Sequence, residues 1–187
     1  MRVENSFEVP APREQAWALL NDVPRVIPCM PGAELTETVD DSHWKAKLTV
    51  KLGPMAFGFA ADVAREEADA AAGRARLATT ARETKGRGSA RATIESSLSQ
   101  VDGGTRVDIV TDVSLTGPVA QYGRGMVQDV ASQLVAQFAD CLRTQLAPRA
   151  DAAPAPPPPA AKPVSGFQLF FGALRRRLAR IVRRRNQ

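Results

Sequence analysis

Catalysis would require a nucleophile, a base or a pair of acids at suitable spacing, and few residues of this chain qualify. His43 is the only histidine, and it directly follows Ser42 in a segment that begins with Asp40 and Asp41. A serine beside a histidine could supply a nucleophile and its general base, yet neighbouring residues of a strand point to opposite faces of the sheet. We therefore interpret this segment as a turn that exposes its histidine.

The two cysteines could bind a metal or form a disulfide, but their spacing indicates neither. Cys29 and Cys141 lie far apart in the sequence and belong to no CxxC motif. Structural zinc sites use clusters of Cys and His, which one histidine and two separated cysteines do not provide. We interpret both cysteines as reduced thiols of a cytosolic protein, and we predict no metal and no covalent cofactor.

The remaining polar motifs also lack a catalytic pattern. Glu66, Glu67 and Asp69 form an acidic cluster, which is most simply the solvated end of a strand. Residues 86–88 and 123–125 both read Gly-Arg-Gly, which matches neither the phosphate-binding loop nor the dinucleotide-binding pattern. A glycine inside a helix costs up to about 1 kcal/mol relative to alanine, so the second motif suggests a close approach at a cavity mouth or to the sheet. No catalytic residue is predicted.

The elements that would position a site follow two periodicities. Apolar residues alternate with polar ones in the expected strands, and they recur at helical spacing from Val119 to Leu146. The expected strands are 3–9, 44–52, 55–63, 75–81, 90–98 and 107–115, and the expected helices are 13–21, 23–27 and 117–146. Pro118 suits the first turn of the long helix, where its missing N–H costs nothing. This order predicts an α+β helix-grip fold, in which a curved antiparallel sheet wraps around the long C-terminal helix.

The inner faces of the later strands carry small side chains. Alanine, serine or threonine stands at positions 61, 75, 79, 81, 90, 92, 96 and 111, whereas protein interiors normally pack to near-crystalline density. Either the long helix settles close to the sheet, or an apolar cavity of the kind that binds small molecules remains between them. The residues predicted to line that cavity are Trp17, Ile27, Met30, Leu48, Val50, Met55, Phe57, Phe59, Ala92, Ile94, Val113, Tyr122, Met126, Val127, Val130 and Leu134.

Charge and proline content divide the chain into three parts. We predict a ligand-binding domain at 1–147, a Pro-rich flexible linker at 148–164 and a basic amphipathic helix at 165–187. Residues 148–163 hold seven of the 14 prolines, a composition that favours extended polyproline II structure. Residues 1–151 carry 17 basic and 20 acidic side chains, whereas residues 152–187 carry eight basic side chains and no acidic one. An anionic partner is therefore expected to meet the tail.

The basic tail has the pattern of a helix that lies in a membrane interface. Most of its large apolar residues share one side at 100° per residue, and arginines occupy the rest. A protein groove could accept the same helix, whereas nucleic acid would leave the phenylalanines without a role. No segment is long and apolar enough to span a bilayer, so we expect peripheral binding to an anionic membrane and no nucleic-acid partner. The residues predicted to bind the membrane are Phe167, Phe170, Phe171, Leu174, Arg175, Arg176, Arg177, Leu178, Arg180, Ile181, Val182, Arg183, Arg184 and Arg185.

Three short motifs occur in the order IPCMPG at 27–32, KLGPM at 51–55 and LTGPVAQYGRG at 115–125. Together they resemble CoxG, the family of the carbon monoxide dehydrogenase G subunit, and the similarity covers about residues 1–146. This family belongs to the SRPBCC superfamily of START-like and birch-pollen-allergen-like domains. The resemblance implies a helix-grip fold with an apolar cavity. It also implies a role at the membrane, where the protein would recruit a molybdenum-containing carbon monoxide dehydrogenase or bring it a lipophilic electron acceptor.

Three hypotheses follow from the residues and the resemblance together. The first is a non-catalytic carrier of a hydrophobic ligand, a quinone such as menaquinone, held at the cytoplasmic face of the cell membrane and linking the dehydrogenase to the respiratory chain. The second is an adaptor that anchors the dehydrogenase without transporting a ligand. The third is a small enzyme of the cyclase or dehydratase kind, which would need polar groups inside the cavity. Only Thr79, Ser96, Thr111 and Tyr122 could supply them, and no acid is expected to face inward.

Overall fold

One antiparallel sheet forms most of the structure. This computed structural model describes residues 1–52 and 55–147, so the predicted linker and tail helix lie outside the described residues. The strands are β1 (Arg2–Val9), β2 (Ala33–Thr38), β3 (His43–Leu52), β4 (Met55–Asp69), β5 (Arg74–Glu83), β6 (Ser89–Val101) and β7 (Gly104–Thr116). Their order is β1-β7-β6-β5-β4-β3-β2. Strands β2 to β7 thus form a continuous meander, and β1 joins its far edge beside β7.

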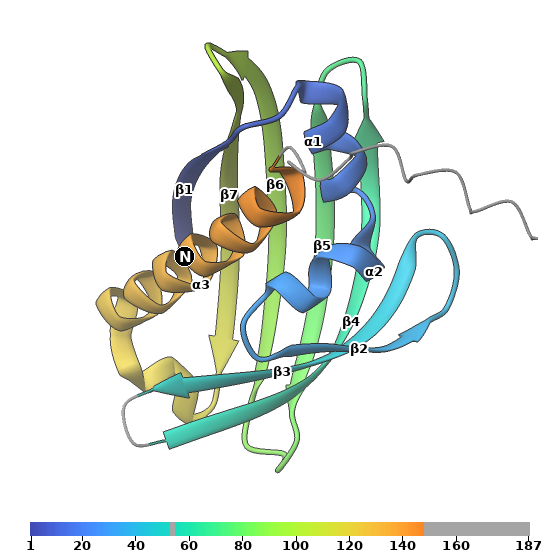
Figure 1. The fold of residues 1–187 in the computed structure, drawn as a ribbon. Coiled ribbons are helices and arrows are strands. Elements are labelled where there is room, and N and C mark those ends of the chain that lie inside the picture. Colours follow the sequence, from blue (N-terminus) through green and yellow to red (C-terminus); the bar gives the residue numbers. More distant parts are fainter. Residues whose placement is uncertain (53–54, 148–187) are drawn as a thin grey trace, which may run out of the picture. The chain divides into compact units, whose positions relative to one another are not determined.

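The helices lie on one face of this sheet (Figure 1). They are α1 (Arg13–Leu20), α2 (Val23–Val26), α3 (Gly123–Leu146) and two 3₁₀ helices, η1 (Ile27–Cys29) and η2 (Pro118–Tyr122). The long helix α3 packs most closely against β1, while α1 contacts β6 and β7. This arrangement confirms the predicted α+β helix-grip fold, a curved antiparallel sheet around a long C-terminal helix.

Strand β2 is the element that alternation does not predict. It reads AELTET and pairs with β3 at the edge of the sheet, with a register shift between Leu35 and Glu37. Only Ala33 and Leu35 are half-buried, and the other side chains are exposed. Because an edge strand with an exposed face buries little apolar surface, its sequence carries almost no period-two signal.

The long helix begins later than its sequence suggests. Residues 118–122 form the 3₁₀ helix η2, and α3 starts at Gly123, whose φ is 77° and ψ is 167°. This backbone region is essentially restricted to glycine. Nothing lies within 4 Å of the point that a Cβ would occupy at Gly123 or Gly125, so the expected close approach at these glycines is wrong. Gly123 is needed because the chain changes direction there.

Buried apolar side chains form two separate clusters. The first joins β1, α1, α2, η1, the adjoining ends of β6 and β7, and the C-terminal half of α3. It consists of Phe7, Val9, Ala16, Leu19, Val26, Cys29, Leu98, Val107, Phe138, Ala139 and Leu142. The second joins β4, β5 and η2, and it consists of Phe57, Phe59, Ala81 and Val119. The two clusters contain different strand segments, so the middle of the inner face of the sheet belongs to neither.

A disulfide links two parts of the first cluster. Cys29, at the end of η1, is bonded to Cys141 on α3, and their Cα atoms lie 5.4 Å apart. The prediction of two reduced thiols is therefore wrong. The residues are 112 positions apart, and spacing alone could not reveal that η1 packs beside the C-terminal half of α3.

Candidate functional site

Burial along α3 changes from one end to the other. In its C-terminal half, the inward side chains of Phe138 and Leu142 are buried, and Leu142 has no exposed surface. Val127 and Leu134 lie on the same stripe of the helix but are only half-buried, and Met126 is 40% exposed. The helix is therefore packed tightly at its C-terminal half, and solvent reaches its inward side in the N-terminal half.

The inner face of the sheet changes in the same way. Leu98 and Val107, paired between β6 and β7, are buried in the first cluster. Farther along the same strands, Thr79, Ala92 and Val113 form a cross-strand row in which every side chain is half-buried. Alanine and threonine are too short to fill the space beneath a helix, and atoms without partners across a gap lose their dispersion contacts.

We call the half-buried surface between the two clusters the open inner face. It is formed by Thr79, Ala92, Ile94, Thr111 and Val113 of the sheet and by Val127, Val130 and Leu134 of α3. Val130 lies at its edge, where it also packs against the second cluster. Most of these side chains are apolar. Solvent-accessible apolar side chains on the concave side of a sheet are the usual composition of a small-molecule site.

The residues predicted to line a cavity do not all meet at this surface. Those that do are Ala92, Ile94, Val113, Val127, Val130 and Leu134. Phe57 and Phe59 are buried in the second cluster, with Val50 and Tyr122 packed against it, and Trp17 and Met30 pack against the first cluster. Ile27 and Leu48 are half-buried outside both clusters, whereas Met55 and Met126 are exposed. The open inner face is thus smaller than the predicted lining.

Two hollows of the described residues lie largely elsewhere. One, of about 270 Å³, lies beside the C-terminal half of α3 and is lined by Ser6, Phe7, Glu8, Arg106 and Arg143. The other, of about 410 Å³, includes Ala92 and Val113. Most of its lining residues, however, occupy the alternate strand positions on the other face of the sheet: Ala78, Thr80, Arg91, Thr93, Asp112 and Ser114. The candidate site therefore rests on the graded burial of α3 and the sheet.

A buried carboxylate lies at one end of the inner face, and the expectation that no acid faces inward is wrong. Glu83 continues the inward series of β5 and is only 5% exposed. Its oxygens accept hydrogen bonds from the backbone N–H groups of Lys85 and Arg87, and one pairs with the Arg87 guanidinium at 3.2 Å. These bonds, led by that of the Arg87 side chain, hold the pKa of Glu83 below its ordinary value. The alternation of β5 could have revealed this residue.

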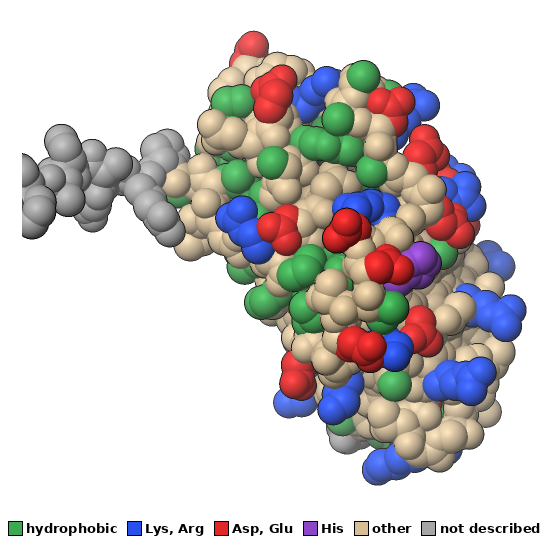
Figure 2. Space-filling view, turned by 90° about the vertical axis from the view of Figure 1, so that its right-hand side faces the viewer, with side chains coloured by type: hydrophobic (Ala, Val, Ile, Leu, Met, Phe, Trp, Pro, Cys, Tyr) green, Lys and Arg blue, Asp and Glu red, His purple; other side chains and the backbone are tan. Residues whose placement is uncertain are grey.

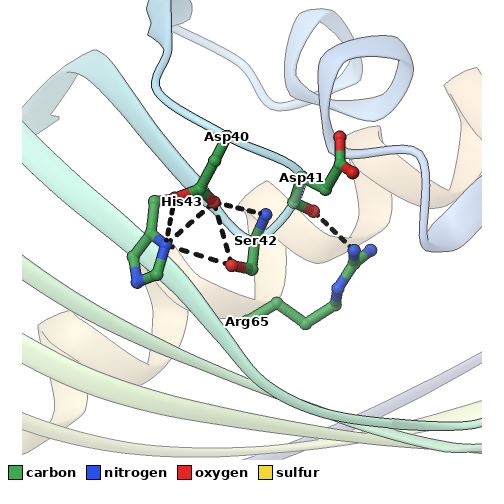
Figure 3. Close-up of polar contacts among 5 residues, drawn as sticks. All are labelled: Asp40, Asp41, Ser42, His43 and Arg65. Atoms are coloured by element: carbon green, nitrogen blue, oxygen red, sulfur yellow. Dashed lines mark hydrogen bonds and ion pairs between the residues drawn. The ribbon is translucent and has the colours of Figure 1, made fainter.

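An arginine also faces inward. Arg65 on β4 donates to the backbone oxygens of Asn21, at 3.0 Å, and Asp41, at 2.5 Å. Its guanidinium also lies 5.3 Å from the centre of the Trp44 ring, a favourable cation–π arrangement. Arg65 thereby joins the end of α1 to the β2–β3 turn, and Figure 3 shows its bond to Asp41 in that turn. Its role is to close this side of the domain, and no sequence motif indicated it.

The Asp40, Ser42 and His43 side chains meet, but not in a catalytic arrangement (Figure 3). The Ser42 hydroxyl and the Asp40 carboxylate both approach the same ring nitrogen, Nδ1 of His43, at 3.0 and 2.9 Å. A catalytic triad instead places the hydroxyl at Nε2 and the carboxylate at Nδ1. Because Ser42 lies in the turn, both side chains can contact Asp40, so the argument from opposite strand faces does not apply.

Asp40 organises this turn. The backbone N–H of Ser42, followed by the side chains of His43 and Ser42, lowers the pKa of Asp40 from 3.8 to about 2. All of these bonds lie at the surface, where the Asp40 and His43 side chains are about half exposed. The group is therefore a solvated turn with an exposed histidine, in agreement with the sequence interpretation.

The described residues contain neither a cluster of metal ligands nor a helix that could span a membrane. Residues 1–52 and 55–147 contain no group of three or more His, Cys, Asp or Glu placed to hold a metal ion. Within the same residues, no helix has both the length and the apolar character needed to cross a bilayer.

Comparison with known families identifies the domain. The family model of the carbon monoxide dehydrogenase G subunit (CoxG) matches residues 6–147. The chain belongs to the CoxG family. This confirms the resemblance seen in its three motifs, and the match covers nearly all of the described residues. CoxG proteins are accessory to carbon monoxide dehydrogenase, so this chain is placed in an accessory family. No match was found among curated proteins.

Solved structures share the fold of this CoxG protein. A conserved protein from Geobacillus kaustophilus aligns over 79% of this chain and 95% of its own, with a TM-score of 0.70 and 21% identity. A START superfamily protein from Mycobacterium smegmatis aligns over 78% and 96%, with a TM-score of 0.51 and 19% identity. The ZhuI aromatase/cyclase from Streptomyces aligns over 83% and 99%, with a TM-score of 0.59 and 16% identity. At these identities the likeness establishes the START-like fold alone.

Proposed function

We propose that this CoxG protein carries a hydrophobic ligand, a quinone such as menaquinone, between the membrane and a carbon monoxide dehydrogenase. The observation that carries this proposal is the open inner face, where apolar side chains remain accessible between two buried clusters. Removing apolar surface from water contributes about 25 cal/mol per Å². A ligand with an apolar ring and tail would cover both the helix side and the sheet side of this surface.

We assign the ligand contacts to the predicted residues on the open inner face. These are Ala92, Ile94, Val113, Val127, Val130 and Leu134. Tyr122 stands edge-on to Phe57, with ring centres 5.9 Å apart, and is half-buried. Its hydroxyl is a donor suited to a quinone carbonyl, whereas the inward Glu83 is already occupied by Arg87.

The proposed role is non-catalytic. The Asp40, Ser42 and His43 group has both partners on one ring nitrogen, and Glu83 is neutralised by its bonds to Arg87. Neither arrangement provides a free general base beside the open inner face. The protein would therefore bind its ligand and release it unchanged.

We further propose that the basic tail holds the protein at the cytoplasmic face of the cell membrane. The support is the sequence of residues 165–187, whose phenylalanines and arginines suit an anionic interface. The Cys29–Cys141 disulfide gives no support to a cytoplasmic location, because such bonds are more common in oxidising compartments. Labelling of thiols in intact cells, before and after reduction, would report the state of the pair at the site where the protein resides.

The most direct test of the carrier function is to extract the bound molecules. Protein purified from membranes is treated with organic solvent, and the extract is analysed by mass spectrometry. We expect a quinone at a fixed molar ratio to protein. An extract that contains neither quinone nor another lipid would contradict the proposal.

A pair of matched substitutions tests the position of the ligand. Ala92→Leu adds three carbons on the open inner face, whereas Ala60→Leu adds the same atoms at an exposed position of β4. We expect the extracted quinone to fall at least tenfold for Ala92→Leu and to remain at the wild-type ratio for Ala60→Leu. Equal quinone content in the two variants would place the ligand elsewhere.

A second candidate function is an adaptor that anchors the dehydrogenase to the membrane without transporting a ligand. The observation that favours it is that the hollows of about 270 and 410 Å³ lie largely outside the open inner face. An adaptor should support carbon monoxide respiration equally well with Ala92→Leu and with Ala60→Leu. A carrier should lose respiration with Ala92→Leu alone, while membrane binding is retained.

A further inference from the structure

One end of the domain gathers four chain segments around the second cluster. The Arg87 guanidinium lies 5.9 Å from the centre of the Phe57 ring, Phe57 contacts Tyr122, and the backbone N–H of Thr84 donates to the oxygen of Gly58. These contacts bring together the adjoining ends of β3 and β4, the β5–β6 turn, η2 and the start of α3. Figure 1 shows these segments toward the lower end of the molecule.

We call this end the tip, and its exposed side chains combine apolar and basic character. Among them are Lys51, Met55, Lys85, Arg124 and Met126; Arg87 is exposed as well and pairs with Glu83. Among the described residues, the exposed large hydrophobic side chains are Val39, Met55 and Met126, which are 51%, 39% and 40% exposed. Met55 and Met126 lie on the tip. Met126 is also at the end of α3 where burial is lowest.

Apart from Arg87, the basic side chains of the tip are not neutralised. Within residues 1–52 and 55–147, Lys51, Lys85 and Arg124 take part in no ion pair, and neither do the neighbouring outward residues Lys47, Arg82 and Arg91. The one acid next to the β5–β6 turn, Glu83, is buried and paired with Arg87. The exposed acid of α3 nearest to the tip is Asp129, nearly two turns from the start of the helix.

The opposite end of the domain has the opposite charge character. The exposed acids there are Glu14 at the start of α1, Glu67 and Asp69 at the end of β4, and Asp102 in the β6–β7 turn. Arg13 is used there to bind the backbone oxygens of Ala70 and Ala71. Figure 2 shows the same trend on one face, with Asp and Glu mainly in the upper part and Lys and Arg predominating in the lower part. The domain therefore has a basic tip although residues 1–151 are net acidic.

We propose that the tip is a second membrane-binding surface, which docks on anionic lipid and brings the neighbouring open inner face close to the bilayer. The proposal rests on the proposed carrier function and extends it from the tail to the domain. The charge of the tip is complementary to anionic headgroups. Its flexible methionines can enter a lipid interface, whereas the aromatic anchors that dominate protein interfaces do not occur among its exposed side chains.

This orientation would serve ligand transfer. The open inner face lies next to the tip, because Val127 and Val130 follow Met126 on α3 and Tyr122 precedes it. A hydrophobic ligand that left the bilayer at the tip would reach apolar side chains within one or two helical turns. The tail alone would hold the domain near the membrane without orienting it.

The test places an environment-sensitive fluorophore on the full chain. Met55→Cys is labelled under non-reducing conditions, so that Cys29 and Cys141 remain bonded, and is mixed with vesicles of phosphatidylcholine containing phosphatidylglycerol. Val39→Cys, an exposed apolar position in the β2–β3 turn, is the matched control. We expect a blue shift and a rise in emission at position 55, no change at position 39, and no change at either position with phosphatidylcholine alone.

Charge removal on the tip provides the second measurement. Each Lys or Arg near an anionic surface contributes about fivefold to binding, so Lys85→Gln with Arg124→Gln should raise the lipid concentration needed for the position 55 signal by about 25-fold. Thermal melting checks that the labelled chain remains folded with and without these two substitutions. Flotation of the full chain with the vesicles is measured in parallel, because it reports binding through the tail.

The outcomes separate the tip from the tail. A chain that floats while position 55 stays in water, or while positions 39 and 55 respond equally, would overturn the tip proposal and leave the tail intact. A response at position 55 to purified dehydrogenase but not to vesicles would also overturn it, because the tip would then be a protein-docking surface. A position 55 response at high lipid without flotation would support the tip and contradict the tail.

Discussion

Breaking the Cys29–Cys141 bond should lower the stability of the domain without unfolding it. The bond closes a loop between residues 112 positions apart, and the chain-entropy model assigns about 4.8 kcal/mol at 25 °C to a loop of that length. Measured losses on removal of native disulfides are about 2–5 kcal/mol. For a domain of this size, 1 kcal/mol corresponds to roughly 2–4 °C in Tm, so we expect Tm to fall by roughly 4–20 °C.

The assay is thermal unfolding followed by circular dichroism, with and without a thiol reductant. Cys29→Ser/Cys141→Ser is the control, because its Tm should equal that of the reduced wild type and should not respond to reductant. Alkylation of the unfolded, unreduced protein followed by mass spectrometry counts the free thiols independently. The disulfide would be refuted if the unreduced protein had two free thiols and its Tm stayed within about 1 °C on complete reduction. The sequence prediction of two reduced thiols would then be correct.

Three further predictions concern an ion pair, a glycine and the tail. Glu83→Gln should lower the free energy of unfolding by about 1–3 kcal/mol, because the bonds to Arg87 weaken. Since the pKa of Glu83 is lowered from 4.5, its contribution to stability is full above pH 4.5 and is lost as the pH falls further. The free energy of unfolding should therefore change less with pH in the variant than in the wild type. Gly123→Ala should cost about 1–3 kcal/mol in urea unfolding because of its backbone conformation, whereas Gly125→Ala, with open space around it, should stabilise by up to about 1 kcal/mol. Ending the chain at Pro148 should leave a folded domain whose flotation with anionic vesicles is strongly reduced, and undiminished flotation would contradict the role of the tail.

Alternation of apolar residues predicted most of the sheet because one face of each central strand is covered. The run from Trp44 to Leu52 shows the reason: apolar side chains alternate with exposed Lys45, Lys47 and Lys51. Alternation did not predict strand β2, because both of its faces are largely exposed. The start of α3 was misplaced because a 3₁₀ turn and an α-helix share nearly the same local spacing, and only the φ of Gly123 separates them.

The site was less predictable than the sheet because it depends on contacts between distant segments. Parity along a strand correctly assigned Ala92 and Val113 to the inner face, but it could not show that Phe57 would be fully buried by η2 while Met55 stayed exposed. The same parity would have assigned Glu83 to the inner face. The Cys29–Cys141 contact required knowing that η1 lies beside α3, which no local pattern states.

The two ends of α3 are held differently, and this difference explains where apolar surface stays open. Its C-terminal half is fixed by the disulfide at Cys141 and by the buried Phe138 and Leu142. Its N-terminal half follows the turn at Gly123 and is less buried, as are small side chains of the sheet such as Ala92. Because a gap of less than an ångström already forfeits much of a dispersion contact, a helix pinned at one end over small side chains leaves its other end underpacked. Breaking the disulfide would loosen the closed end without filling the open one, so Cys29→Ser/Cys141→Ser should lose thermal stability and keep its ligand content.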